Sequence, residues 1–314
     1  IVEYSPLWFE GRTRFVHTWI DMHEVIELRE GPWAGALAFL TGAGDTSPAA
    51  GDRLAYGLIV FDPATEEVRW DWSSHGELGD GEPIDPKLDY ARVSPFEDEE
   101  LDWLHGNALV HGLDGDGGQF FWMSLRHQDW IIKIDVETDA VVWRLGFEGD
   151  FELVDDLDAA EPQALSPELW MFHQHSPEIV ARDGDRTQLL VFDNGNLRPD
   201  AAGEWDWDAE PYSRVASFEL DESRWRAAPI FSLGSDDPAD PDHFFSLIRG
   251  DVDLAADGDR LLYLAGGETS SFIAETTYPD GEELWRATLP QGFAFRVQYF
   301  PSLYDTTWSY SDDP

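Results

Sequence analysis

The chain has 314 residues, with 64 acidic and 20 basic side chains, so its formal net charge at neutral pH is −44. A general nucleic-acid binder needs a basic surface, which excludes that class, and the same charge argues against docking on anionic membranes. The 42% share of hydrophobic residues argues against disorder, and the absence of cysteine rules out disulfides, thiolate chemistry and cysteine zinc sites. Such a composition is typical of a salt-adapted or extracellular protein, although an acidic, arginine-rich proteome would give it too.

No hydrophobic run approaches the length of a transmembrane span. The sequence begins at Ile1 without a methionine. We therefore expect a trimmed chain whose missing segment could have held an export signal.

A repeated unit of four short strands runs along the chain, taken here from its N-terminal end. Each unit has an inner strand and its partner, then a hairpin that ends at or near a tryptophan. The predicted strands of the four units are 22–28, 36–40, 57–62 and 67–70; 103–109, 120–123, 130–135 and 140–143; 173–179, 188–192, 214–220 and a return near Trp225; and 249–254, 261–264, 272–275 and a return to Trp285. Asp-Gly pairs at 114–115, 183–184 and 257–258 predict tight hairpin turns inside three units, since glycine supplies positive φ.

Four-stranded units that recur every 50 to 75 residues are typical of propeller blades around a channel. The sequence therefore predicts an all-β fold, a single β-propeller domain over 1–314, with five blades by counting repeats or six. We expect residues 293–300 to close the ring together with strands near residues 1–15, which would remove open sheet edges. Residues 76–102 and 147–171 are predicted to be long loops over one face.

Polar side chains recur at one position of the predicted inner strands, the strands that line the axis of a propeller. They are His23, then His105 with Asn107, then His173 with His175, then Arg249. Further candidates follow second strands: Arg126 and His127 in the second unit, and Arg198 and Arg214 in the third. Histidines in phase in three successive units favour a functional cluster, whereas His75, His111 and His243 fall off this pattern and are expected on the surface or in turns.

The sequence around His173 and His175 is the most informative part of this set. Residues i and i+2 point to the same side of an extended strand. A turn at 184–185 and a returning strand bring 193–198 back towards them, which predicts an anion pocket of imidazole and guanidinium. The alternative is that one histidine caps a turn and the other fills the core.

Several motifs resemble those of the bacterial aryl-sulfate sulfotransferases, in the same order from about residue 20 to 290. The matching segments are MHEV (22–25), DWLHGN (102–107), SLRHQ (124–128) with IKID (132–135), HQH (173–175), FDNGNLR (192–198) and YSR (212–214).

This resemblance implies a propeller, typically periplasmic, that moves a sulfuryl group from an aryl sulfate to a phenol by a ping-pong route without the nucleotide sulfate donor. It implies His105 and His175 as sulfuryl-binding histidines and Arg198 as the arginine that neutralises the sulfuryl oxygens. His23, His173, Asn107, Arg126, His127, Arg214 and Arg249 are then expected to bind substrate. Arginine offers fixed donors for oxyanions, and neutral imidazole can attack sulfur or take a proton.

One departure from the family pattern leaves alternatives open. The family's transient sulfuryl acceptor is a histidine after a Gly-Gly strand end, and the matching segment 266–271 has none. A different histidine-cluster enzyme, metal-dependent or lyase-type, or a non-catalytic ligand-binding propeller are the other hypotheses. We expect a small aryl sulfate or phenol as ligand, no nucleic acid, no cofactor unless the histidines bind a metal, and a periplasmic or extracellular location; the sequence does not give the oligomeric state.

Overall fold

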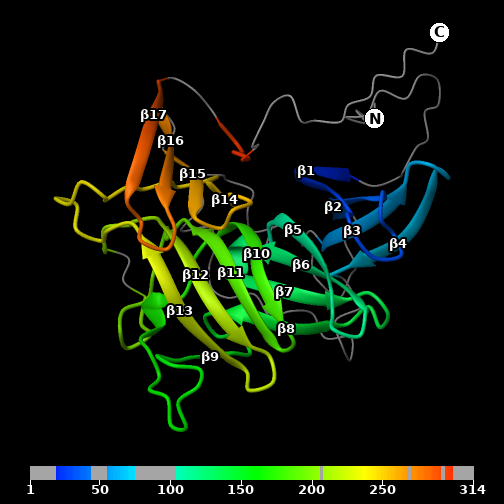
Figure 1. Ribbon diagram of the computed structural model, residues 1–314, viewed down its shortest axis with the longest axis horizontal. Coiled ribbons are helices and arrows are strands. Elements are labelled where there is room, and N and C mark those ends of the chain that lie inside the picture. Colours follow the sequence, from blue (N-terminus) through cyan, green and yellow to red (C-terminus); the bar gives the residue numbers. More distant parts are fainter. Residues whose placement is uncertain are drawn as a thin grey trace.

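The computed structural model describes residues 19–43, 55–74, 104–205, 208–266, 270–290 and 294–299. These residues fold into four sheets without any α-helix, and all strand pairs are antiparallel except β9 with β13, which is parallel (Figure 1). Each sheet has four consecutive strands in chain order, and the third gains a fifth, β9, on the outside of β13. The predicted all-β fold of four-stranded units is confirmed.

The observed strands follow the predicted units closely. The first sheet holds β1 (Trp19–Glu27), β2 (Leu37–Ala43), β3 (Ala55–Asp62) and β4 (Glu67–Ser73). The second holds β5 (Gly106–Leu113), β6 (Gln119–Leu125), β7 (Trp130–Asp135) and β8 (Val141–Gly146). The third holds β9 (Glu152–Leu153), β10 (His175–Asp183), β11 (Arg186–Asp193), β12 (Arg214–Asp221) and β13 (Arg226–Leu233). The fourth holds β14 (Asp251–Leu254), β15 (Arg260–Gly266), β16 (Ser270–Thr277) and β17 (Glu283–Pro290).

The first strands of the four sheets lie next to one another in chain order. Contacts join β1 to β5, β5 to β10 and β10 to β14, so these four strands form the inner side of a propeller-like arrangement. In Figure 1 the sheets succeed one another from blue to orange and do not close into a ring. The expected closing strands near residues 1–15 lie outside the described residues, and 294–299 are not in a strand.

Two of the three predicted Asp-Gly turns have glycine at positive φ, and the third differs. Gly184 has φ 58° in a hairpin that pairs Asp183 with Arg186, and Gly258 has φ 77°. In the turn after Asp114, positive φ falls on Gly117 instead, whose N–H donates to the Asp114 carbonyl. That hairpin is longer than a two-residue turn, so its left-handed residue comes later.

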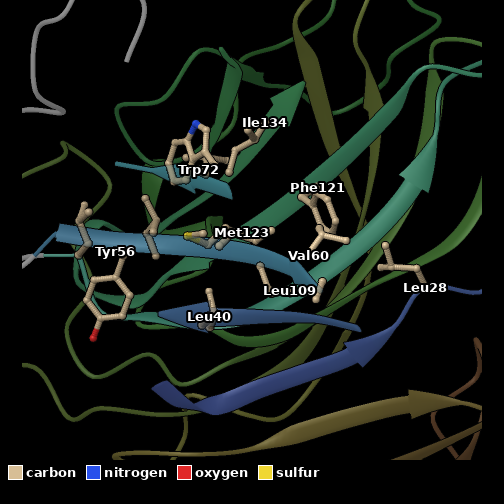
Figure 2. Packing of buried hydrophobic residues seen from close by; sticks show 14 of the residues in the cluster. Leu28, Leu40, Tyr56, Val60, Trp72, Leu109, Phe121, Met123 and Ile134 are labelled. Atoms are coloured by element: carbon tan, nitrogen blue, oxygen red, sulfur yellow. The ribbon is translucent and has the colours of Figure 1, made fainter. Parts of the chain in front are cut away.

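A separate hydrophobic core fills each space between neighbouring sheets. The core between the first and second sheets is built from alternate strand residues, among them Leu40, Val60, Phe121 and Met123 (Figure 2). Similar clusters join the second sheet to the third and the third to the fourth. Strands of the second sheet bury both faces, with Phe121 and Met123 towards the first sheet and Phe120 and Trp122 towards the third, which explains their continuous apolar runs.

The segment 147–171 is more ordered than a surface loop. It contains β9 and a 3-10 turn at Pro167–Leu169, and it buries Phe151, Leu153 and Trp170 in the core between the second and third sheets. The other predicted loop, 76–102, lies outside the described residues.

Candidate active site

Three inner strands are entered through a residue in the left-handed backbone region. The φ angles are 49° at His105, 55° at His173 and 68° at Arg249. Positive φ is uncommon outside glycine and recurs at functional sites. His173 and Arg249 therefore precede β10 and β14, which begin at His175 and Asp251. The prediction that His173 and His175 share one side of an extended strand is wrong, because the backbone turns at His173.

Four imidazoles from three sheets form a continuous row. The ring centroids of His23 and His105 are 4.9 Å apart, those of His105 and His127 are 4.7 Å apart, and those of His127 and His173 are 6.3 Å apart. His23 comes from β1, His105 from the entry to β5, and His127 from the 3-10 turn Arg126–Gln128 after β6. The structure thus brings together four of the predicted site histidines at one end of the inner strands, and we call them the imidazole row.

Arg126 is the arginine that contacts this row. Its side chain is buried, Nη1 lies 2.8 Å from Nε2 of His127, and Nη2 donates to the Leu247 carbonyl at 3.2 Å. Guanidinium only donates, so Nε2 of His127 accepts and this imidazole is neutral with its proton on Nδ1. The row therefore has one fixed positive charge in direct contact with the ring of His127.

Gln174 fixes the two histidines on either side of it. Its buried side-chain amide donates to the Trp130 carbonyl at 2.9 Å and to Oγ of Ser124 at 3.1 Å. Its backbone carbonyl accepts a hydrogen bond of 2.8 Å from Nδ2 of Asn107. Gln174 is thereby anchored in the second sheet, and Asn107 holds the backbone between His173 and His175.

The protonation of His175 can be assigned from its hydrogen-bond network. Asn194 donates through Nδ2 to the carbonyls of Ser246 (2.8 Å) and Arg249 (2.5 Å), so its Oδ1 is the free acceptor. Nδ1 of His175 lies 2.7 Å from this Oδ1 and must donate to it. The Nε2 atom is left with a lone pair, and none of the described residues hydrogen-bonds to it.

Burial, reinforced by the positive charge of Arg126, holds the pKa of His175 well below its usual range. The hydrogen bond to Asn194 opposes this effect without overcoming it. His175 is thus a neutral imidazole in the site, which is the form that acts as a nucleophile or base.

Asp129 positions His173. Its Oδ1 accepts the His173 backbone N–H at 2.7 Å and lies 3.2 Å from the imidazole Nδ1. Burial lowers the pKa of His173, although the Asp129 charge acts in the opposite direction. The sequence did not predict Asp129, Gln174 or Asn194 as site residues. Asp129 directly follows the SLRHQ motif, Gln174 is the middle residue of HQH, and Asn194 lies within FDNGNLR.

Arg198 and Arg214 lie in a separate buried network around Asp193. Oδ2 of Asp193 accepts from Nη2 of Arg198 and from Nε of Arg214, both at 2.8 Å. Nη1 of Arg198 donates to the Trp170 carbonyl at 3.0 Å, and its guanidinium lies over the ring of Tyr212. We call this group the Asp193 network. The hydrogen bonds of Arg198 go to Asp193 and to backbone carbonyls rather than to a histidine, and its convergence with the histidines stays a prediction.

The remaining candidates lie around the row. Arg249 borders a small pocket with Ser246 and Ser271, and its carbonyl accepts from Asn194. His111 is an inner-strand residue of β5 against Phe121, whereas His243 bonds the Ser235 carbonyl in a turn as expected. His17 and His75 lie outside the described residues.

Over the described part of the chain, no group of three or more His, Asp or Glu side chains is arranged to hold a metal ion. No helix in that part is long and apolar enough to span a membrane.

The fold is propeller-like, and imidazole and guanidinium groups gather at one end of its inner strands. The family model described as Arylsulfotransferase (ASST) matches residues 17–299, and the chain belongs to this family. The resemblance noted in the sequence is therefore confirmed. Small aryl compounds are the substrates that the family implies.

No curated protein matches the chain. Solved structures overlap with it only loosely. A hydrazine synthase of Kuenenia stuttgartiensis is 10% identical over 89% of this chain and 53% of its own, with a TM-score of 0.35. The Dos1 propeller is 9% identical over 84% and 47%, with a TM-score of 0.35. A GH43 β-1,3-galactosidase is 10% identical over 84% and 73%, with a TM-score of 0.34. The chain spans about half the length of the first two, and at these scores the likeness carries no functional argument.

Proposed function

We propose that the protein transfers a sulfuryl group from an aryl sulfate to a phenol beside the imidazole row, with Nε2 of His175 as the transient acceptor; Arg126 and His105 both act on the charge of this ring. The single observation that supports this best is the fixed tautomer of His175, whose Nδ1 proton is held by Asn194. A neutral ring with a free Nε2 lone pair is prepared to attack sulfur without first losing a proton. Membership of the arylsulfotransferase family supports the reaction class.

The anion is proposed to bind at Arg126. Its charge acts on both His173 and His175, which places it near the two rings. Guanidinium donors aimed at the developing charge stabilise a transferring oxyanion in a water-poor site. Arg198 is proposed to act indirectly, because its Nη1 and Nη2 groups donate to Asp193 and to backbone carbonyls.

The proposed transfer takes place in two successive displacements at sulfur. In the first, His175 Nε2 forms a bond to sulfur while the bond from sulfur to the aryl oxygen breaks, and the phenolate leaves with a proton from a neighbouring imidazolium, which becomes a neutral imidazole. In the second, an acceptor phenol gives a proton back to that imidazole and attacks sulfur, which releases His175. His105 lies next to His23 and His127 and is the proposed proton carrier.

The histidine that transiently accepts the sulfuryl group is sought by where the histidines lie in the fold. His243 is the last histidine in the sequence, and it bonds in a turn between β13 and β14. The fourth sheet therefore contributes no imidazole from its own strands, so the acceptor is proposed among the first three sheets. The reaction as proposed needs no cofactor. The location is proposed as periplasmic or extracellular, because members of the family are typically periplasmic.

The test is steady-state kinetics with 4-nitrophenyl sulfate as donor and phenol as acceptor. Parallel double-reciprocal lines and loss of turnover in His175→Ala would support the proposal. The matched control is His243→Ala, which should keep the full rate. Unchanged turnover in His175→Ala would exclude His175 as the transient acceptor. A wild type that is inactive with a broad panel of donors would favour a different histidine-cluster enzyme or a non-catalytic ligand-binding propeller.

A further inference from the structure

Arg296 reaches all four inner strands at once. Nη2 donates to Oε2 of Glu24 on β1 at 2.6 Å and to the Asn107 carbonyl on β5 at 3.3 Å. Nη1 donates to Oγ of Ser176 on β10 and to Oδ1 of Asp251 on β14, the latter at 3.3 Å. A single guanidinium thus joins four sheets that no strand pairing joins into a ring.

The neighbours of Arg296 are fastened in the same place. Val297 N–H donates to Oδ2 of Asp251 at 2.7 Å, and Tyr299 N–H donates to Oδ2 of Asp253. Phe295 lies against His23, with ring centroids 5.9 Å apart, so the segment touches the imidazole row directly. We call residues 294–299 the axial strap.

The strap separates two different ends of the axis. The inner strands run from the imidazole row towards a cavity of about 750 Å³, which is lined by residues that come later in the same strands. Glu24, Glu178, Asp251 and Asp253 contribute carboxyl groups to the lining, and Arg296 itself forms part of the wall. One end of the axis is therefore imidazole and the other carboxylate, with a guanidinium between them.

Titratable groups from each inner strand line the cavity beside Arg296. They are Glu24 and Glu27 on β1, His111 on β5, Glu178 on β10, and Asp251 and Asp253 on β14, together with Arg29 and Glu30. Burial raises the pKa of Glu24 to about 7, which Arg296 opposes and Asp251 reinforces. Burial also raises the pKa of Asp251, and Arg296 again opposes it. Buried carboxylates need a nearby cation to remain charged, and Arg296 supplies one to Glu24 and Asp251, whereas Arg29 acts on Asp253.

We propose that the axial strap is an internal gate, in which Arg296 occupies a guanidinium-binding site formed by Glu24 and Asp251 and closes the imidazole row to ligands arriving through the carboxylate cavity. Release of Arg296 opens that route. The inference concerns access to the imidazoles and holds whichever group they transfer, so its failure is distinguishable from failure of the proposed sulfuryl transfer.

The test measures how fast diethyl pyrocarbonate modifies each histidine, by peptide mass spectrometry on the full chain. In Arg296→Ala, His23 and His105 should react about tenfold faster than in the wild type, because local opening governs reagent access. His243 serves as the internal reference and should not change. Arg286→Ala is the matched control, since it removes an arginine that pairs with Glu283 and lies over the Phe272 ring, outside the contacts of Arg296.

Chemical rescue adds a second arm. About 20 mM guanidinium chloride, far below denaturing concentrations, should restore slow modification in Arg296→Ala by filling the vacated site, whereas tetramethylammonium should not. Should Arg296→Ala fail to fold, Glu24→Gln carries the test, since it weakens the same contact and keeps the arginine. Equal modification rates at His23 and His105 in the wild type and the folded variants would overturn the proposal.

Discussion

Two arginine sites lie a short distance apart in this protein, and they differ in what remains for a ligand. In the Asp193 network, two guanidinium groups share one carboxylate and cover the carbonyl of Trp170. Beside the imidazole row, Arg126 contacts the imidazole of His127 and the Leu247 carbonyl. In the first arrangement a carboxylate lies between the two guanidinium groups, whereas in the second the guanidinium lies directly against an imidazole and its charge acts on His173 and His175.

This difference shows that the partners of an arginine decide its role more than its place in a motif. Arg198 has the motif position, yet its contacts are those of a residue that holds the loop 193–198 against 168–172. That loop carries Asn194, which fixes the tautomer of His175. We therefore propose that Arg198 supports the site indirectly through this loop, whereas the charge of Arg126 acts on His175 itself, as that of Arg296 also does.

Removing the Arg126 charge is expected to give the largest effect. Arg126→Ala should lower kcat/KM for aryl sulfate about 10³-fold, because one preorganised donor of an oxyanion site is worth about 10²–10³. Arg126→Lys is the matched variant, and it should recover part of the loss because it restores the charge without the fork. Full activity in both variants would show that the sulfuryl group does not bind there.

Breaking the Asp193 network should instead unfold the protein. Asp193→Asn leaves two buried arginines without their carboxylate, so we expect a loss of about 3–5 kcal/mol in unfolding free energy by urea denaturation. Arg198→Ala should likewise lose more stability than Arg126→Ala. If Arg198→Ala keeps the wild-type midpoint but loses turnover, Arg198 belongs to the reacting site and the comparison fails.

Glu178 tests the carboxylate end through its pH dependence. Burial raises its pKa to about 7 from an ordinary 4.5, so the folded state binds an extra proton between these values and loses stability as the pH rises through this window. Glu178→Gln removes the penalty and can still accept the Leu254 N–H. We expect stabilisation of at most about 3 kcal/mol at pH 8 and none at pH 4.

The control for this experiment is the exposed Glu161→Gln. It should shift the melting temperature equally little at both pH values. A Glu178→Gln variant that is no more stable than the wild type at pH 8 would mean that the charged carboxylate is well solvated in the cavity.

Salt should have the smallest and most general effect. A formal charge of −44 makes the folded chain self-repulsive, and screening relieves this repulsion. Melting temperature should rise from low to molar potassium chloride. The Asp193 network should depend less on salt than the exposed ion pairs because it is buried. A melting temperature that stays constant or falls as salt is added would indicate that bound cations already neutralise the surface.

Much of the fold was predictable because each strand satisfies a local rule. Short apolar runs at 57–62 and 130–135, with turn glycines at Gly184 and Gly258, predicted units that the sheets confirm. The histidine phase across units likewise predicted a cluster, and His23, His105, His127 and His173 lie in one row.

The rest depended on tertiary contacts that periodicity does not carry. The backbone turn at His173 follows from anchoring by Asp129 and Gln174, which lie in or next to other elements. Arg198 could not be separated from Arg126 without knowing that Asp193 binds the former. Arg296 was expected in a closing strand, and only its contacts with four sheets reveal an axial position.

The most direct test of the central claim is to locate the sulfuryl group on the enzyme. The wild type is mixed with aryl sulfate in the absence of a phenol acceptor, quenched in base, digested and mapped by mass spectrometry. The account predicts one equivalent of phenol released and a sulfuryl group on the peptide that contains His175, which disappears when phenol is added before the quench. A sulfuryl group on any other residue, or a burst of phenol in His175→Ala, would contradict it.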